Sequence, residues 1–377
     1  MNLTELKSKL EECGVVGAGG AGFPSHLKLF ENAKTVIVNG AECEPLSNSD
    51  KLLLQFNAPE ILKALDVVMR AVGASEGVVA VKKTALNSID AINRELPNYT
   101  KVRLFALGDF YPAGDEVVLT YEVLGKIVPQ GGRPSDFGVI VFNAETMYNI
   151  YRAVFENAAV TEKIVSVSGE VREPITVRVP VGTSFGEVIK LANGTKIENY
   201  VVISGGPMTG RIANLDSKVE KTTNSILVLP LDSRVVKLRQ SDVKTDMRRA
   251  FSACSQCRMC TDLCPRALLG HSIEPHMLMR MVVSGNSANA APFLNSQYCC
   301  GCGVCALFAC HQGLTPGKIV NKFRSALKES GVKSAQTSGT PTAHELREWR
   351  KISQSRLITR LGLGQYRNGT KIVESSL

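Results

Sequence analysis

The 377-residue sequence lacks a long apolar run and a recognisable N-terminal leader. A membrane-spanning helix needs roughly 18 or more largely apolar residues, and no segment approaches that length. A secreted protein would begin with a leader that is later removed. These two absences exclude a direct membrane span and predict a cytoplasmic, reducing location, where thiolates persist.

The sequence also lacks the features of a nucleic-acid-binding protein. Its formal net charge is +9, and residues 318–377 contain twelve Lys or Arg against four Glu. This basic segment has only three aromatic residues, Phe323, Trp349 and Tyr366, and no known reading motif. We therefore expect no nucleic-acid partner, and interpret the segment as a solvated face or a docking site for an acidic partner.

Cysteine, by contrast, is concentrated in one region. Eight of the eleven cysteines form two groups, Cys254, Cys257, Cys260 and Cys264 with spacing CxxCxxCxxxCP, and Cys299, Cys302, Cys305 and Cys310 with spacing CxxCxxCxxxxC. This spacing is typical of a ferredoxin-like domain that holds two 4Fe–4S clusters. Zinc sites use two CxxC pairs and gain nothing from a third cysteine at the same interval. A disulfide framework suits small secreted chains. We therefore favour iron–sulfur clusters, with zinc as the main alternative.

The spacing also predicts how the ligands divide. In such folds three close cysteines reach three corners of a cube, and the fourth, which precedes a proline, ligates the partner cluster. We expect one cluster on Cys254, Cys257, Cys260 and Cys310, and the other on Cys299, Cys302, Cys305 and Cys264. Cys300 adjoins Cys299, and the CxxC spacing to Cys302 favours Cys299 as the ligand. Cys310 departs from the usual pattern, because His311 follows it where proline is expected.

Residues 1–158 have the pattern of an α/β domain. Short apolar runs predict buried strands at Thr35–Val38, Gly77–Val81, Val102–Ala106 and Val139–Phe142. Helical spacing of apolar residues lies between them, from Ile61 to Val72 and over Leu86–Leu96. We expect a largely parallel sheet covered by helices.

Three further regions follow. Alternation from Ile175 to Val181, a helix near Ser184–Leu191 and strands at Tyr200–Ser204 and Ile226–Leu229 predict a β-grasp module over residues 160–232. Residues 242–330 hold the cysteines and form the helical ferredoxin-like domain. Residues 331–377 comprise a linker, Gly331–Ala343, and a basic helical segment, Glu345–Leu361.

A glycine-rich loop, Gly17–Gly22, contains GxGxxG, and Glu42 lies about twenty residues further on, as in a dinucleotide fingerprint. The fingerprint should follow a strand, whereas a polar helical segment precedes this loop, so we reject a Rossmann site. Glycines without Cβ still let backbone N–H groups approach a phosphate or a flat ring closely. Lys28 follows as a point charge suited to phosphate.

Four segments resemble a known family. They are GAGGAGFPSHLK (residues 17–28), NGAECEP (39–45), YPAGDE (111–116) and NAET (143–146). The same order marks the flavin- and NADH-binding subunit of respiratory complex I, the Rnf complex C subunit and the cobalamin reductases of propanediol-utilization microcompartments. The chain most resembles the last group, because the loop begins the chain and Leu46 follows Pro45 where Rnf subunits tend to carry Tyr. The resemblance spans residues 10–365, and the β-grasp segment resembles the soluble-ligand-binding β-grasp (SLBB) domain of these proteins.

The resemblance implies an FMN site on the first domain with NADH over its face. Gly17, Gly19, Gly20 and Lys28 would cradle the flavin, and Asn39, Glu42, Asn143 and Thr146 would bond its phosphate, ribityl chain and ring edge. Phe23 and Glu44 would face the nicotinamide nucleotide, and Tyr111, Gly114 and Glu116 would close the pocket. The flavin-binding protein of complex I has Arg where this chain has Ala18 and an acid where it has Ala41.

Together these features predict an NADH-dependent flavoprotein oxidoreductase that passes electrons through FMN and two 4Fe–4S clusters. Hydride transfer requires no side-chain acid or base, so we name no catalytic residue. The resemblance implies cobalamin as the acceptor, inside a bacterial microcompartment with shell or enzyme partners. The alternatives are an Rnf-type electron-transport protein, and a donor to another redox protein such as a glycyl-radical activase.

Overall fold

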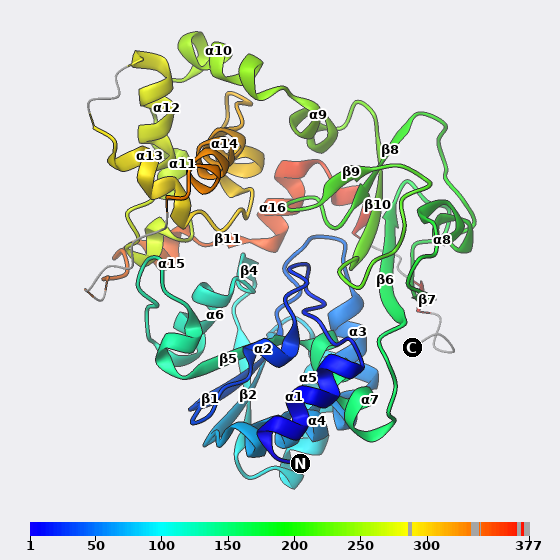
Figure 1. Ribbon diagram of the computed structural model, residues 1–377. Helices are drawn as coiled ribbons and strands as arrows, with labels where there is room; N and C mark the ends of the chain where they lie inside the picture. Colours follow the sequence, from blue (N-terminus) through cyan, green and yellow to red (C-terminus); the bar gives the residue numbers. More distant parts are fainter. Residues whose placement is uncertain (286–288, 333–338, 340, 368–370, 373–377) are drawn as a thin grey trace.

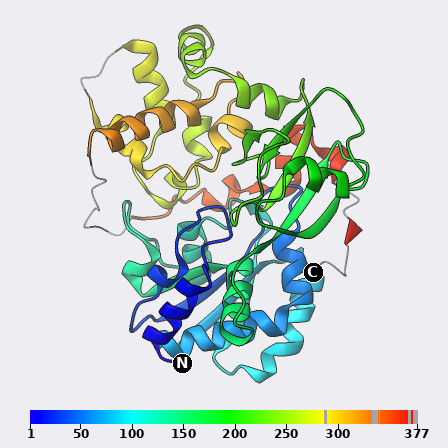
Figure 2. The same ribbon diagram turned by 45° about the vertical axis from the view of Figure 1, so that its right-hand side comes forward.

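The computed structural model describes residues 1–285, 289–332, 339, 341–367 and 371–372. An α/β domain forms one end of the molecule, and the β-grasp module and the cysteine-rich helices lie side by side at the other (Figure 1). The C-terminal helices lie between these parts in both views (Figures 1 and 2).

The α/β domain is built on a four-stranded sheet. Its strands are β1 (Thr35–Gly40), β2 (Glu76–Lys82), β3 (Val102–Leu107) and β5 (Val139–Asn143). They lie in the order β3-β2-β1-β5, and every pair is parallel, so the predicted parallel sheet is confirmed. The helices of this domain are α1 (Leu3–Glu12), α2 (Ser25–Lys28), α3 (Ser49–Phe56), α4 (Ala58–Val72), α5 (Leu86–Glu95), α6 (Glu116–Leu124) and α7 (Ala144–Phe155).

Helices cover both faces of this sheet. Val36 and Val38 of β1 pack with buried residues of α1, α4 and α7, whereas Ile37 packs with those of α6. Successive strand residues point to opposite faces, and both faces here are apolar. That is why the strands read as continuous apolar runs in the sequence.

The second region has the expected β-grasp arrangement. Its elements are β6 (Glu162–Gly169), β7 (Ile175–Pro180), α8 (Phe185–Leu191), β8 (Tyr200–Ser204), β9 (Arg211–Ala213), β10 (Ser225–Pro230) and β12 (Lys371–Ile372). The sheet order is β12-β7-β6-β10-β8-β9, with β6 and β10 parallel and β6 antiparallel to β7. Phe185, Val188 and Ile189 of α8 pack against the inner face of this sheet.

The cysteine-rich region is helical. Its helices are α9 (Arg234–Gln240), α10 (Val243–Ala253), α11 (Met259–Asp262), α12 (Pro275–Ser284), α13 (Ala291–Asn295) and α14 (Pro316–Glu329). Two small apolar cores stabilise it, one around Met279 and Ile319, the other around Leu278 and Val320. The predicted domain boundaries fall between these elements and stay predictions.

The predicted basic helical segment, Glu345–Leu361, contains two short helices with a strand between them. The structure has α15 (Arg347–Arg350), β11 (Ile352–Ser353) and α16 (Gln354–Leu361), and β11 pairs with β4 (Phe110–Tyr111) of the α/β domain. Helix α15 ends at Arg350, because the backbone of Lys351 is not helical. Helix α16 begins at Gln354, where the Ser353 hydroxyl caps it by accepting a hydrogen bond from the Arg356 amide. Residues 333–338 and 340 of the predicted linker lie outside the described residues.

The basic charges of this segment are partly used inside the molecule. Arg347 is buried, and both Arg347 and Lys351 pair with Glu122 of α6. Ile352 and Leu357 enter an apolar core that also contains Tyr111 and Val304. The segment therefore packs against the rest of the chain, and these two charges are not part of a solvated face. Among the described residues, no helix has the length and apolar character to cross a bilayer.

Candidate functional site

The predicted flavin residues lie at the carboxyl edge of the parallel sheet. From β1 the chain adds β2 and then β3 on one side of the sheet, and it later returns to add β5 on the other side of β1. The direction in which strands are added therefore reverses between β1 and β5. Asn39 and Asn143 are paired in register at the ends of these two strands. Such a switch point leaves a crevice beyond the strand ends, where α/β proteins bind ligands.

The glycine loop lies over this edge and is held by the start of α7. The Ala18 amide donates to the Thr146 hydroxyl at 2.9 Å. A Cβ at Gly19 would lie only 3.3 Å from the Asn143 Cβ, so a larger residue there would push the loop away. Gly20 has φ of +109° and open space on its Cβ side. The loop thus needs glycine at position 20 for the backbone conformation and at position 19 for close packing against Asn143.

The turn at residues 111–116 meets the same edge. The Asn39 side chain donates to the Gly114 carbonyl at 2.9 Å, and a Cβ at Gly114 would lie 3.3 Å from Ala41. Lys28, the last residue of α2, pairs with Glu116 at 2.7 Å and donates to the Val141 carbonyl at 3.0 Å. The structure therefore brings together the glycine loop, both strand ends and this turn. Phe23 lies at the rim with 41% of its surface exposed.

Two of the predicted residues have other partners. Glu42 is buried, and its carboxylate accepts bonds from the Ser47 hydroxyl at 2.6 Å and the Lys51 amide at 2.9 Å, at the start of α3. Glu44 accepts bonds from the Met208 amide at 2.9 Å and the Thr209 amide at 2.8 Å, in the turn between β8 and β9. Burial raises the pKa of Glu44 despite these bonds. Glu44 thus joins the α/β domain to the β-grasp module, and its predicted contact with ribose stays a prediction.

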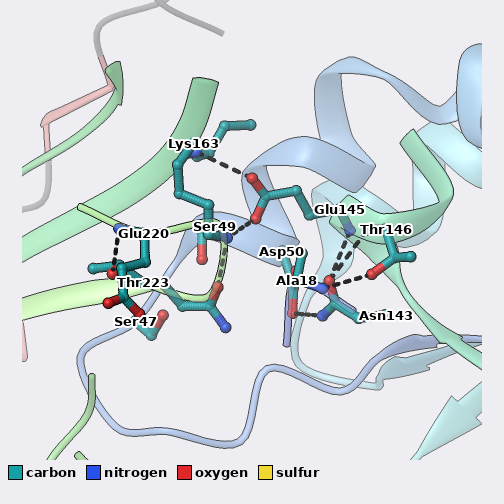
Figure 3. A network of polar contacts seen from close by, with 12 residues as sticks. Ala18, Ser47, Ser49, Asp50, Asn143, Glu145, Thr146, Lys163, Glu220 and Thr223 are labelled. Atoms are coloured by element: carbon teal, nitrogen blue, oxygen red, sulfur yellow. Dashed lines mark hydrogen bonds and ion pairs between the residues drawn. The ribbon is translucent and has the colours of Figure 1, made fainter. Parts of the chain in front are cut away.

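Sequence reasoning missed a buried ionic network behind the glycine loop (Figure 3). Asp50 accepts a bond from the Asn143 side chain at 2.7 Å. Lys163 of β6 pairs with Glu145 of α7 and donates to Asn224 at 2.6 Å, and both charged side chains are almost fully buried. Burial raises the pKa of Asp50 well above its usual value, and the nearby Glu42 and Glu145 carboxylates add to the effect.

The eight clustered cysteines surround two separate cavities. We call them site one, with Cys254, Cys257, Cys260 and Cys310 around a cavity of about 30 Å³, and site two, with Cys264, Cys299, Cys302 and Cys305 around a cavity of about 360 Å³ that Cys300 also lines. The exchange of the fourth ligand between the two runs divides the cysteines into the same two sets, and their role as cluster ligands stays a prediction. Each of the eleven cysteines is a free thiol. Within the described residues, no three Cys, His, Asp or Glu side chains gather closely enough to chelate a single metal ion.

The two CxxCxxC loops have the same backbone path. Positive φ occurs at Gln256 and Arg258 in the first loop, and at Gly301 and Gly303 in the second. These positions match only when Cys254 corresponds to Cys299, which supports Cys299 rather than Cys300 as the ligand. An amide also points at sulfur in each loop. The Gln256 side chain donates to Cys254 and the Gly301 backbone to Cys299, both at 3.3 Å.

One thiol at each site has a strongly raised pKa. Burial raises the pKa of Cys260 to about 12, and the neighbouring Cys257, Cys310 and Cys254 contribute. Burial likewise raises the pKa of Cys264 to about 12, with contributions from Cys300 and Cys299. Without a bound cation these two thiols would stay protonated, whereas iron would hold them as thiolates, because a bound cation favours the deprotonated form.

Two contacts connect site two to the predicted flavin pocket. The Tyr111 hydroxyl donates to the Cys302 carbonyl at 2.7 Å. Arg266, which sequence reasoning missed although it lies two residues after Cys264, pairs with Asp115 at 2.9 Å. No such contact links the described residues of site one to this pocket, so site two is the nearer of the two sites.

The residues present fit the cofactors that the sequence implies. The loop supplies glycines at a switch point beside an asparagine-capped helix, with a lysine within reach, as a flavin phosphate requires. Sites one and two each supply four thiols, on loops in which amides approach sulfur, as iron–sulfur clusters require.

Comparison with known proteins divides the chain in the same way. Residues 10–152 match the Nuo51 FMN-binding domain, residues 164–212 the SLBB domain, and residues 253–315 a 4Fe-4S dicluster domain. The predicted order of an α/β FMN-binding domain, a β-grasp module and a ferredoxin-like domain is thereby confirmed.

Several curated proteins are similar to this chain in sequence. The chain is 38% identical over 375 residues to the cobalamin reductase PduS of Salmonella typhimurium, covering 99% of this chain and 82% of that protein. It is 30% identical over 296 residues to the C subunit of the Na(+)-translocating ferredoxin:NAD(+) oxidoreductase complex of Acetobacterium woodii, covering 77% of this chain and 64% of that one. A chain of an NAD+-reducing [NiFe]-hydrogenase has a similar fold, with a TM-score of 0.55 and 19% identity, over 90% of this chain and 64% of that one.

Proposed function

Because this chain belongs to the family of the cobalamin reductases PduS, we propose that it reduces cobalamin with electrons from NADH, using FMN and two 4Fe–4S clusters. The similarity to that family extends over nearly the whole chain. A flavin oxidoreductase with iron–sulfur clusters is the coarser conclusion, and it follows from the matched domains. The number of clusters, the donor and the acceptor belong to the proposal.

The bond between the Tyr111 hydroxyl and the Cys302 carbonyl carries the proposal. Tyr111 begins the turn that borders the predicted flavin pocket, and Cys302 is a predicted ligand at site two. A 2.7 Å bond between them brings the loops of two cofactor sites into direct contact, as a protein that passes electrons between them requires.

A flavin bound at the switch point would supply the conversion between two-electron hydride chemistry and single-electron transfer. The chain's own residues hold and orient it. Gly19 allows close approach, and Asn39 fixes the turn at Gly114. The Lys28 ammonium, which is paired with Glu116, would supply positive charge near a phosphate. The thiolates of sites one and two would hold clusters that take one electron each.

NADH as the donor has separate support. The exposed ring of Phe23 lies at the rim of the glycine loop, where it is available to stack on a nucleotide. The Glu44 carboxylate, by contrast, already accepts hydrogen bonds from Met208 and Thr209. A nucleotide that bonded to Glu44 would therefore compete with the turn that contains these two residues.

Anaerobic purification followed by titration tests the proposal. We expect close to eight iron and eight sulfide per chain for two cubane clusters, one flavin, bleaching of the flavin by NADH, and reduction of added cobalamin. Colourless protein without sulfide would refute the cofactor assignment. Flavin that dithionite bleaches and NADH does not would refute the donor alone.

The alternatives differ in the acceptor. An Rnf-type role is less favoured, because identity to those proteins is lower and the chain spans a smaller share of them. A protein acceptor such as a glycyl-radical activase predicts that cobalamin is reduced slowly while the partner is reduced fast. Residence in a microcompartment, with shell or enzyme partners, stays a prediction, and co-purification with shell proteins would test it.

A further inference from the structure

A buried ion pair lies between the predicted flavin pocket and site two. The Arg266 guanidinium donates to the Asp115 carboxylate at 2.9 Å, and their side chains are only 16% and 14% exposed. Arg266 also contacts the Cys300 side chain, which lines the cavity of site two. One ion pair thus touches both regions.

Asp115 has a second structural role on the flavin side. Its other carboxylate oxygen caps α6 by accepting bonds from the Val117 and Val118 amides at 3.2 and 3.1 Å. The next residue, Glu116, pairs with Lys28 of the predicted cradle at 2.7 Å. A continuous series of contacts therefore runs from Lys28 through the start of α6 to Arg266 and the loop of site two.

Arg266 is not fully satisfied by these contacts. Its Nε is buried, and no residue of the described chain accepts a bond from it. An unpaired buried donor costs free energy unless a partner is supplied. A charge retained there despite that cost points to a role beyond packing.

We propose that Arg266 and Asp115 are positioning residues that hold the site-two loop against α6 and set the reduction potential of the cluster at site two. This inference rests on the proposed clusters, but it involves neither NADH nor cobalamin. Reduction adds one negative charge to a cluster. A nearby cation therefore favours the reduced state and a nearby anion disfavours it, more strongly where water is excluded.

Because the two side chains carry opposite charges, removing each one should shift the reduction potential of the site-two cluster in the opposite direction. Arg266→Gln leaves the Asp115 carboxylate without its cation, so the potential of the site-two cluster shifts to more negative values. Asp115→Asn leaves the Arg266 cation alone, so the potential shifts to more positive values. Asparagine is also a good helix N-cap, so the cap of α6 is preserved. The double variant returns toward the wild-type potential.

The measurement is an anaerobic redox titration of the holoprotein with dithionite and mediators, followed by electron paramagnetic resonance of each cluster. Opposite shifts confined to one cluster support the proposal. Shifts of both single variants in the same direction, or no shift with iron content intact, overturn it. Arg103→Gln is the matched control, because it removes one cation from a surface pair with Glu76 in the α/β sheet, and we expect no shift.

Loss of iron would be informative as well. If Arg266→Gln loses half of its iron, Arg266→Lys decides the matter, because it keeps the charge. Retained iron with a near wild-type potential in Arg266→Lys supports the proposal, and loss of iron in both variants overturns the electrostatic role. Wild-type protein without any iron would instead refute the proposed function, whereas iron-containing protein that fails to reduce cobalamin leaves this test intact.

Discussion

The Lys163–Glu145 pair is expected to be a major determinant of stability between the α/β domain and the β-grasp module. Both side chains are almost completely buried, at 1% and 4% exposure, so solvent screens them little. Lys163→Met would leave the Glu145 carboxylate without its cation, with Asp50 nearby. Breaking a buried pair by removing one partner costs about 3–5 kcal/mol, because an uncompensated charge remains. We expect Lys163→Met to lower the free energy of unfolding by about that amount at neutral pH.

The loss should depend on pH with a definite sign. Burial, and then the Glu42 and Glu145 carboxylates, raise the pKa of Asp50 in the folded state, and Lys163 opposes this. An acid whose folded pKa is raised binds its proton more tightly when folded, so stability falls as pH rises through that pKa. Removing Lys163 raises the pKa of Asp50 further. The loss in Lys163→Met should therefore be larger at pH 8 than at pH 5.

Anaerobic urea unfolding of the holoprotein measures this effect, with Lys190→Met, at an exposed position on α8, as the control. The double variant Lys163→Met/Glu145→Gln removes both charges and should recover most of the lost stability, because replacing a whole buried pair is often close to neutral. A loss under about 1 kcal/mol, comparable to an exposed pair, would refute the reasoning. So would a double variant no more stable than Lys163→Met.

Three further predictions concern the cofactor sites. Gly19→Val should lower flavin content strongly and leave iron unchanged, because the added Cβ would lie against Asn143, and flavin and iron assays of one preparation check this. Cys257→Ser should lose about half of the iron, as expected when one of two clusters is lost, whereas Cys300→Ser should keep it, and equal losses would contradict the assigned ligands. Tyr111→Phe removes one buried hydrogen bond and should lower the free energy of unfolding by about 1 kcal/mol, which urea unfolding would measure.

Features encoded by local spacing are predictable from the sequence. The four parallel strands are among them, because a strand buried on both faces reads as a short apolar run, as at Val139–Phe142. The cysteine groups are another case, because three predicted ligands of one cluster lie in a single loop, so their spacing reflects local geometry rather than the rest of the fold.

Features that depend on distant contacts are not predictable in this way. Lys163 shares a strand face with the buried Val165 and Val167, and nothing in the sequence indicates that Glu145 and Asn224 enclose its ammonium. Glu44 lies in a polar loop, and nothing in the sequence indicates that its carboxylate meets Thr209, 165 residues away. The predicted basic helical segment Glu345–Leu361 includes the strand Ile352–Ser353, which forms by pairing with Phe110–Tyr111, far away in the sequence.

The backbone of the cysteine loops indicates why both should hold clusters. Glycine adopts positive φ readily, and Gly301 and Gly303 do so in the second loop. Gln256 and Arg258 adopt the same conformation in the first loop without being glycine, which costs of order 1–2 kcal/mol per residue. Such a cost persists only where the surroundings impose the conformation. Ligation of Cys254, Cys257 and Cys260 to one cluster would impose it, because the two strained residues lie on either side of Cys257.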